Sequence, residues 1–227
     1  MKIQQRIDNY VLETGFPRAL FVSEDGRMIG IWVMGNDYTV KSNYYGGYPH
    51  GYLRRMKALF PDKSNVLHLF SGQVDKAEFP GKTVDINPSN GADYVDDAQR
   101  LEKVPVEEFD LVLADPPYSV EDCDHYQTSM IKRNVVMDVL GKRLRPGAHV
   151  VWLDQVLPMY RKVDFEVQGY IGMVKSTNHR YRTIAIFVKR SATTAPGSHL
   201  ALEDSGLVRT VPLAGANFAS GSQMLLF

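Results

Sequence analysis

The sequence has few of the features that mark secreted and membrane proteins. Cys123 is the only cysteine in 227 residues, so no disulfide can form within the chain. No stretch reaches the roughly 20 apolar residues of a membrane span. The first residues, MKIQQRIDNY, have no apolar core of a signal peptide. We therefore expect a soluble, cytoplasmic protein without a membrane partner.

The chain also has no net charge. Lys plus Arg and Asp plus Glu both number 26, which gives a formal net charge of +0. Any contact with nucleic-acid phosphate must therefore depend on local basic patches rather than on a global field. The length is enough for one domain with a full core but short for two large ones.

Residues 1–62 are predicted to form an N-terminal extension. The run ALFVSEDGRMIGIWVM, residues 19–34, reads as two strands joined around Asp25 and Gly26, a pair that suits a tight hairpin turn. A loop rich in Gly and Tyr follows, and then LRRMKALF, whose apolar residues share one helical face. These apolar residues are Leu53, Met56, Leu59 and Phe60.

Residues 63–190 have the pattern of an α/β domain. Short apolar runs, each followed by polar or turn residues, predict buried parallel strands at 66–70, 83–86, 111–114 and 149–153. Residues 126–144 predict a helix that crosses between two parallel strands. Residues 165–174 and 183–189 predict an antiparallel hairpin at the end of the sheet. Residues 191–227 are rich in Ala, Ser, Gly and Thr and predict a flexible tail.

Small and acidic residues follow the predicted strands, where open parallel sheets bind their ligands. Phe70, Ser71 and Gly72 come after the first core strand, and the small residue lets the backbone approach a ligand. Asp85 ends the second strand, where it suits the hydroxyls of a ribose. Asp97 follows a brief third strand and is suited to accept from an adenine amino group. Asp115 ends the run LVLADPPY.

This order of sites resembles the class I S-adenosylmethionine-dependent methyltransferases, in particular the amino-methyltransferases that include DNA adenine methylases. The resemblance covers roughly residues 65–190 and implies a Rossmann-like fold and S-adenosylmethionine as cofactor. It implies that Phe70, Ser71 and Gly72 hold the methionine part, that Asp85 with Ile86 binds the ribose, and that Asp97 with Ala98 meets the adenine. The family often has two or more glycines in the first motif, and this chain has one. The segment before Asp97 is short for the usual helix, so Asp96 is an alternative to Asp97.

The tetrapeptide Asp115, Pro116, Pro117 and Tyr118 suits methyl transfer to an amino nitrogen. The lone pair of an exocyclic amine on a base is delocalised into the ring, so the amine is a poor nucleophile. Hydrogen bonds from the amine to Asp115 and to the Pro116 carbonyl localise that lone pair. Two prolines stiffen the turn, and Tyr118 stacks on the target ring. In duplex DNA the base must be flipped out. The alternative is a surface turn after a strand.

Basic residues are the candidates for nucleic-acid contact. The tip of the C-terminal hairpin is KSTNHRYR, and the alternative is a solvated turn. Its candidate residues are Lys175, His179, Arg180, Tyr181 and Arg182. For Arg54, Arg55 and Lys57 we favour a solvated helix face over a phosphate contact. The polar run at residues 121–125 predicts a helix cap and no metal site.

The last five residues resemble the bacterial sliding-clamp-binding peptide. In that pattern Leu226 and Phe227 fill an apolar pocket while Gln223 anchors by hydrogen bonds. The alternative is a strand that packs on the protein's own core. The clamp interpretation indicates a protein recruited to replicating DNA in a bacterial or phage setting.

These features together predict an enzyme that methylates an amino nitrogen of a DNA base, with adenine N6 as the first choice. RNA and a protein glutamine side chain are alternatives, because both present a planar amino group. A second hypothesis is a methyltransferase fold that binds DNA or the clamp without turnover. No segment is long enough for a large target-recognition domain, so we expect a short or relaxed recognition site.

Overall fold

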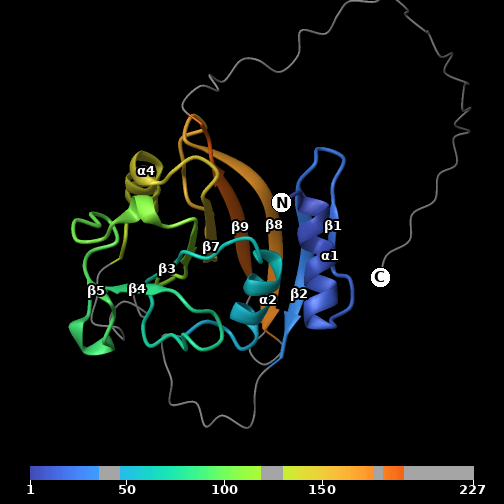
Figure 1. The fold of residues 1–227 in the computed structure, drawn as a ribbon, viewed down its shortest axis with the longest axis horizontal. Coiled ribbons are helices and arrows are strands. Elements are labelled where there is room, and N and C mark those ends of the chain that lie inside the picture. The colour runs from blue at the N-terminus through green and yellow to red at the C-terminus, as the bar shows by residue number, and fades with distance from the viewer. Residues whose placement is uncertain (36–46, 119–129, 176–180, 192–227) are drawn as a thin grey trace, which may run out of the picture. The chain divides into compact units, whose positions relative to one another are not determined.

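The computed structural model describes residues 1–35, 47–118, 130–175 and 181–191 (Figure 1). The described residues all belong to one compact unit, which lies within Met1–Gly197. No helix of the described part is long and apolar enough to cross a membrane.

The N-terminal part contains two helices and the predicted hairpin. Helix α1 (Ile3–Thr14) was not predicted from the sequence; strands β1 (Leu20–Val22) and β2 (Met28–Met34) pair antiparallel, as predicted. Helix α2 (Tyr52–Leu59) covers the predicted helical run. Apolar residues of α1 recur along one face and are buried with those of α2 in one core. That periodicity was the available signal for α1.

Five parallel strands form one side of the sheet, from β7 to the edge strand β5, and their parallel pairing was predicted. They are β3 (Val66–Leu69), β4 (Lys82–Asp85), β5 (Tyr94–Val95), β6 (Leu111–Ala114) and β7 (His149–Asp154). Every residue of β3, β6 and β7 is buried, which explains their continuous apolar runs. Short 3-10 helices, η1 (Pro88–Asn90) and η2 (Val106–Glu108), lie in two of the connections.

The predicted C-terminal hairpin is also confirmed. Strands β8 (Phe165–Lys175) and β9 (Tyr181–Lys189) pair antiparallel, and β9 pairs antiparallel with β7. Strand β8 therefore runs parallel to β7. Its carboxyl end, at Lys175, lies at the same edge of the sheet as the carboxyl ends of the parallel strands β3 to β7.

The nine described strands form one sheet in the order β1-β2-β8-β9-β7-β6-β3-β4-β5. The sheet is mostly parallel, and the fold is Rossmann-like, as predicted. Strand β2 pairs with β8 from Met28 opposite Gly169 to Met34 opposite Lys175. The N-terminal hairpin thus belongs to the same sheet as the parallel strands β3 to β7 and joins it through β8.

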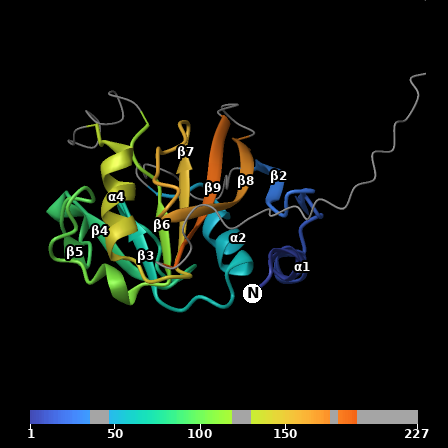
Figure 2. The same cartoon turned by 90° about the horizontal axis from the view of Figure 1, so that it is seen from above.

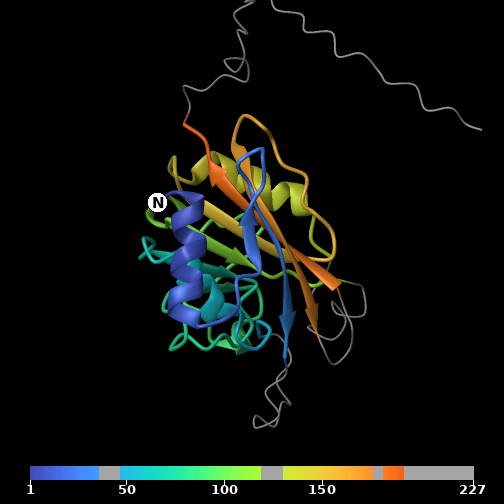
Figure 3. The ribbon, with the colours of Figure 1, turned by 90° about the vertical axis from the view of Figure 1, so that its right-hand side faces the viewer.

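Helices cover both faces of this sheet. One core contains buried residues of α1 and α2, and the other contains those of α4 (Arg133–Arg143). Figures 2 and 3 show α1 and α4 on opposite sides of the strands. The sequence predicted that α4 would begin at residue 126, and this start was wrong. Residues 130–132 are not helical, and residues 126–129 lie outside the described part.

Candidate functional site

The carboxyl ends of the parallel strands bring the predicted site residues to one edge of the sheet. Strand β3 lies between β6 and β4, so the turn after β3 is flanked by the segments that carry Asp115 and Asp85. Asp97 follows β5, which pairs with β4. The order of sites along the chain thus becomes a row of neighbouring strand ends.

The turn after β3 is fastened directly to the end of β4. The Gly72 backbone N–H donates to Asp85 Oδ2 at 2.8 Å, and the Ser71 N–H donates to the Val84 carbonyl at 3.1 Å. Gly72 has a φ of 49°, in the left-handed region that favours glycine. The predicted glycine turn and the predicted acid are therefore one hydrogen-bonded corner.

Phe70 has an unusual backbone conformation for a bulky residue. Its φ is 57°, which costs an L-residue about 1 kcal/mol or more. Strand alternation would place Phe70 on the same face as Val66 and His68. Instead its ring makes an edge contact with Trp152 in the opposite core, with 6.3 Å between centroids. Residues held in such conformations cluster at functional sites.

The carboxylate of Asp85 is half-buried, and both of its oxygens accept backbone hydrogen bonds at this corner. Besides the bond from Gly72, its Oδ1 accepts from the Asn87 N–H at 2.8 Å. Each oxygen still has a second lone pair for a ligand hydroxyl. Ile86, the next residue, is 52% exposed and offers an apolar surface beside the acid.

The loop after β5 distinguishes Asp96 from Asp97. Both oxygens of Asp96 hold the loop, because Oδ1 accepts from the Asp97 N–H at 2.8 Å and Oδ2 from the Lys103 N–H at 2.7 Å. Asp97 uses Oδ1 to accept from the Gln99 N–H at 2.9 Å. Among the described residues its Oδ2 has no hydrogen-bond partner, so the geometry favours Asp97 over Asp96 as a ligand acceptor. Ala98 is buried behind it.

The tetrapeptide after β6 is tied into the site through Tyr118. The Tyr118 hydroxyl donates to Asp115 Oδ1, and Arg182 Nη1 donates to the Tyr118 oxygen at 2.8 Å. The Arg182 guanidinium also lies over the Tyr118 ring, 4.2 Å from its centroid. Pro116 is buried, and Pro117 is half-buried. These contacts are more than a solvated surface turn requires.

Two tyrosines that sequence reasoning missed lie beside this motif. Tyr48 donates to the Leu113 carbonyl at 3.1 Å, two residues before Asp115, and its ring stacks on Tyr52 with 5.1 Å between centroids. Burial, together with the negative charge on Asp115, raises the pKa values of both hydroxyls well above their usual range. Both therefore stay neutral at pH 7. The Tyr-rich loop before α2 was the only sequence signal.

An ion pair anchors α4 to the end of β7. Asp154 is 1% exposed and accepts from Arg133 Nε at 2.6 Å and from Trp152 Nε1 at 3.1 Å. The Gln155 N–H donates to its other oxygen at 2.7 Å. Asp154 lies at the edge of the site but is engaged by the protein itself, so its role is structural.

The basic residues fall into three groups. Arg182 contacts Tyr118, Lys175 ends β8 at the site edge, and His179 and Arg180 lie outside the described residues. The prediction of a solvated helix face is wrong for Arg55, which is half-buried, 4.1 Å from the Phe16 ring centroid, and bonded to Tyr10.

The neighbouring helix residues fit that prediction only in part. Arg54 is exposed, yet its Nη2 donates to the Thr14 carbonyl at 3.1 Å. Lys57 is exposed, as expected.

Two other predictions concern residues outside the described part: the polar run 121–125 and the C-terminal peptide with Gln223, Leu226 and Phe227. Within residues 1–35, 47–118, 130–175 and 181–191, no group of three or more His, Cys, Asp or Glu residues could hold a metal ion.

No protein-family model and no curated protein matches this chain. Among solved structures it is similar to TrmN from Thermus thermophilus, with 17% identity and a TM-score of 0.46 over 60% of this chain and 48% of TrmN. It is also similar to the N-methyltransferase NodS from Bradyrhizobium japonicum WM9, with 14% identity and a TM-score of 0.42 over 63% of this chain and 94% of NodS. A TehB-like SAM-dependent methyltransferase from Corynebacterium glutamicum gives 14% identity and a TM-score of 0.41 over 64% of this chain and 90% of that protein. The chain spans about half the length of TrmN. These likenesses concern the fold alone.

Proposed function

We propose that this protein is an S-adenosylmethionine-dependent methyltransferase that modifies an exocyclic amino nitrogen of a DNA base, with adenine N6 as the first choice. One observation carries the proposal. A hydrogen-bonded corner made by Gly72 and Asp85 lies next to β6, the strand that Asp115 directly follows. A cofactor site and an acceptor for an amine thus occupy adjacent strand ends, where open α/β sheets bind ligands.

The residues at this corner fit the cofactor. The turn of Phe70 to Gly72 would hold the methionine part, and Gly72 has no side chain to obstruct it. Asp85 and Ile86 would hold the ribose, and the spare Oδ2 of Asp97, beside Ala98, would accept from the adenine amino group. When bound, S-adenosylmethionine supplies an electrophilic methyl group on a sulfonium.

The amine would be activated by acceptors on the tetrapeptide. The Asp115 carboxylate and the Pro116 carbonyl accept its two N–H bonds and localise the nitrogen lone pair. The stiff proline turn holds these acceptors in place, so that positioning supplies much of the rate. After methyl transfer the nitrogen carries a positive charge and must lose one N–H proton, and the Asp115 carboxylate that accepts the hydrogen bond from this N–H would receive it.

Two features support DNA as the substrate. Lys175 places a basic group at the same edge of the sheet as Asp115. The C-terminal peptide, if it binds the bacterial sliding clamp through Gln223, Leu226 and Phe227, brings the enzyme to DNA in a bacterial or phage cell. RNA, a protein glutamine and a non-catalytic binding module are the alternatives.

The test is transfer of a tritiated methyl group to DNA, RNA and protein in parallel. We expect label in DNA, on adenine. Asp115→Ala should abolish transfer and leave cofactor binding intact, whereas Glu102→Ala, at an exposed ion pair with Arg100, should change neither. Label in RNA or protein alone would move the enzyme to that substrate class. Cofactor binding without transfer to any of the three would favour the binding module.

A further inference from the structure

Arg182 and Tyr118 come from distant parts of the chain and meet at the candidate active site. Arg182 lies on β9, and Tyr118 follows β6 by four residues. They are joined twice, by the hydrogen bond of 2.8 Å to the Tyr118 oxygen and by the guanidinium over the ring at 4.2 Å. A guanidinium that both stacks and donates fixes the plane and the rotation of the ring together.

The same tyrosine is bonded to the proposed amine acceptor. Its hydroxyl donates to Asp115 Oδ1, so guanidinium, phenol and carboxylate form one chain of contacts. Only Pro116 and Pro117 separate Tyr118 from Asp115 along the backbone. Arg182 therefore acts on the geometry of the whole tetrapeptide through one side chain.

Arg182 also limits where a substrate ring can stack. Because its guanidinium lies over one face of the Tyr118 ring, a target ring cannot stack on that face. A flat nucleobase gains binding energy when it stacks on an aromatic side chain such as that of Tyr118.

The burial of Arg182 argues against a phosphate contact. The side chain is part-buried, and its Nε is buried without an acceptor among the described residues. A phosphate-binding arginine presents its donors to the solvent-exposed backbone of the nucleic acid. The unpaired Nε is instead a donor held inside the site.

We propose that Arg182 is a positioning residue that fixes Tyr118, so that one face of the ring stacks on a planar nucleobase while Asp115 receives the amine. The inference rests on the proposed function and replaces the phosphate contact expected for Arg182 from the sequence.

The kinetic test compares Arg182→Ala, Tyr118→Ala and the double variant on a short DNA oligonucleotide. Arg182→Ala should lower kcat by about tenfold and leave the KM for S-adenosylmethionine unchanged. The double variant should be no slower than Tyr118→Ala, because both changes remove one interaction. Arg182→Lys keeps the charge but loses the planar stack, and should also be slow. It serves as the second variant if Arg182→Ala fails to fold.

Salt dependence separates positioning from phosphate binding. A lost phosphate contact would lower the slope of log affinity against log salt by about 0.7 to 0.9. We expect no change in slope for Arg182→Ala. Arg190→Ala is the matched control, since Arg190 follows the other end of β9 and pairs with Glu166, and it should alter neither kcat nor slope. The inference would be overturned if the losses of kcat in Arg182→Ala and Tyr118→Ala add in the double variant, or if Arg182→Ala changes the salt slope.

A spectroscopic measurement tests the contact between Arg182 and Tyr118 even if the protein shows no methyltransferase activity. In the full chain labelled with ¹³Cζ-tyrosine, Tyr118→Phe identifies the Tyr118 resonance, and Arg182→Ala should shift it. If the wild-type protein transfers no methyl group, the proposed function fails while this measurement still tests the contact. An unshifted Tyr118 resonance refutes the role of Arg182.

Discussion

Tyr48 is half-buried and Tyr52 is buried, and the hydroxyls of these neighbouring phenols have different surroundings. Tyr48 donates to the Leu113 carbonyl at 3.1 Å. The Tyr52 hydroxyl is fully buried and has no partner among the described residues. A buried polar group without a hydrogen bond destabilises the protein.

Replacing each hydroxyl should therefore affect stability differently. Tyr48→Phe should lower the free energy of unfolding by about 1 kcal/mol, since it removes a hydrogen bond. Tyr52→Phe should leave that free energy unchanged or raise it by up to about 1 kcal/mol. Urea denaturation at pH 7 measures both. If Tyr52→Phe destabilises as much as Tyr48→Phe, the Tyr52 hydroxyl has a partner in solution.

Gly72 should matter for cofactor binding as well as for backbone conformation. At a φ of 49°, Gly72→Ala introduces strain of about 1 kcal/mol and a methyl group where the cofactor would approach. We expect a clear loss of affinity for S-adenosylmethionine by calorimetry. Gly26→Ala is the matched control, because Gly26 has a φ of 78° in the turn between β1 and β2. It should be strained to a similar degree and bind cofactor normally; equal losses would mean that Gly72 acts only through stability.

At the scale of elements, local patterns predicted the strands but not the start of α4. Strands β3, β6 and β7 are buried along their whole length, so their sequences are apolar throughout. The start of α4 depends on Arg133, whose partner Asp154 lies 21 residues later. A contact between residues so far apart produces no periodic pattern in the sequence.

Long-range contacts also explain which site residues were missed. Tyr48, Tyr52 and the Arg182 contact with Tyr118 were not predicted, whereas Asp85 and Asp115 were, because each directly ends or follows an apolar strand.

The Arg133 and Asp154 pair should be strongly coupled. Asp154→Leu leaves a largely buried guanidinium unpaired and should lower the free energy of unfolding by about 3 kcal/mol. The double variant Arg133→Met with Asp154→Leu should recover part of that loss, because an apolar pair avoids the cost of burying charge but leaves Trp152 Nε1 without its acceptor. Denaturation of the two single variants and the double variant provides the coupling energy. Additive losses would mean that the pair contributes little in solution.

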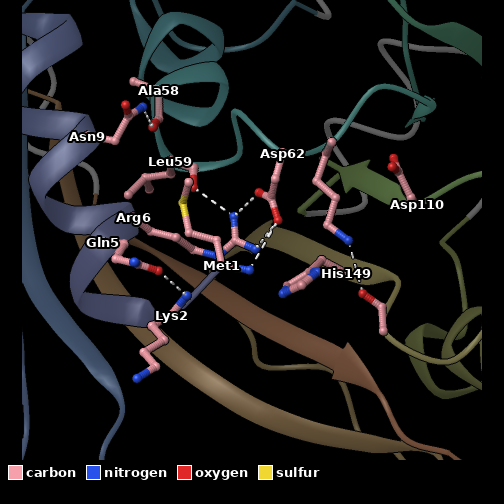
Figure 4. A network of polar contacts seen from close by, with 12 residues as sticks. Met1, Lys2, Gln5, Arg6, Asn9, Ala58, Leu59, Asp62, Asp110 and His149 are labelled. Atoms are coloured by element: carbon pink, nitrogen blue, oxygen red, sulfur yellow. Dashed lines mark hydrogen bonds and ion pairs between the residues drawn. The ribbon is translucent and has the colours of Figure 1, made fainter.

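At the scale of the whole molecule, a polar network ties α1 to the sheet edge opposite the candidate site (Figure 4). Arg6 is 2% exposed and bonds to Asp62 at 2.5 and 2.9 Å and to the Leu59 carbonyl at 3.0 Å. Its guanidinium lies 4.8 Å from the centroid of the Phe60 ring, which makes an edge contact with His149 at 5.3 Å. Contacts of one buried arginine thus link α1, the end of α2 and the start of β7.

Two buried histidines should make this fold sensitive to acid. Burial lowers the pKa of His68 to about 4, and burial with the charges of Arg6 and Lys63 lowers the pKa of His149 to about 4. Since an unfolded histidine has a pKa near 6.5, the unfolded chain binds more protons between about pH 6.5 and 4. Stability should therefore fall as the pH drops through this window, by up to about 2 kcal/mol per histidine at pH 5.

Urea denaturation at pH 7, 6 and 5 measures this loss and assigns it. His149→Gln should remove about half of the fall between pH 7 and 5, whereas His50→Gln, at an exposed position, should leave the fall unchanged. Asp62 affects stability at lower pH. Burial raises its pKa, but its hydrogen bonds to Arg6 outweigh this and lower the pKa to about 2. The stabilisation that ionised Asp62 contributes is therefore lost only below about pH 4. A fall between pH 7 and 5 that His149→Gln does not reduce would show that His149 is not buried neutral, and that its contact with Phe60 does not persist in solution.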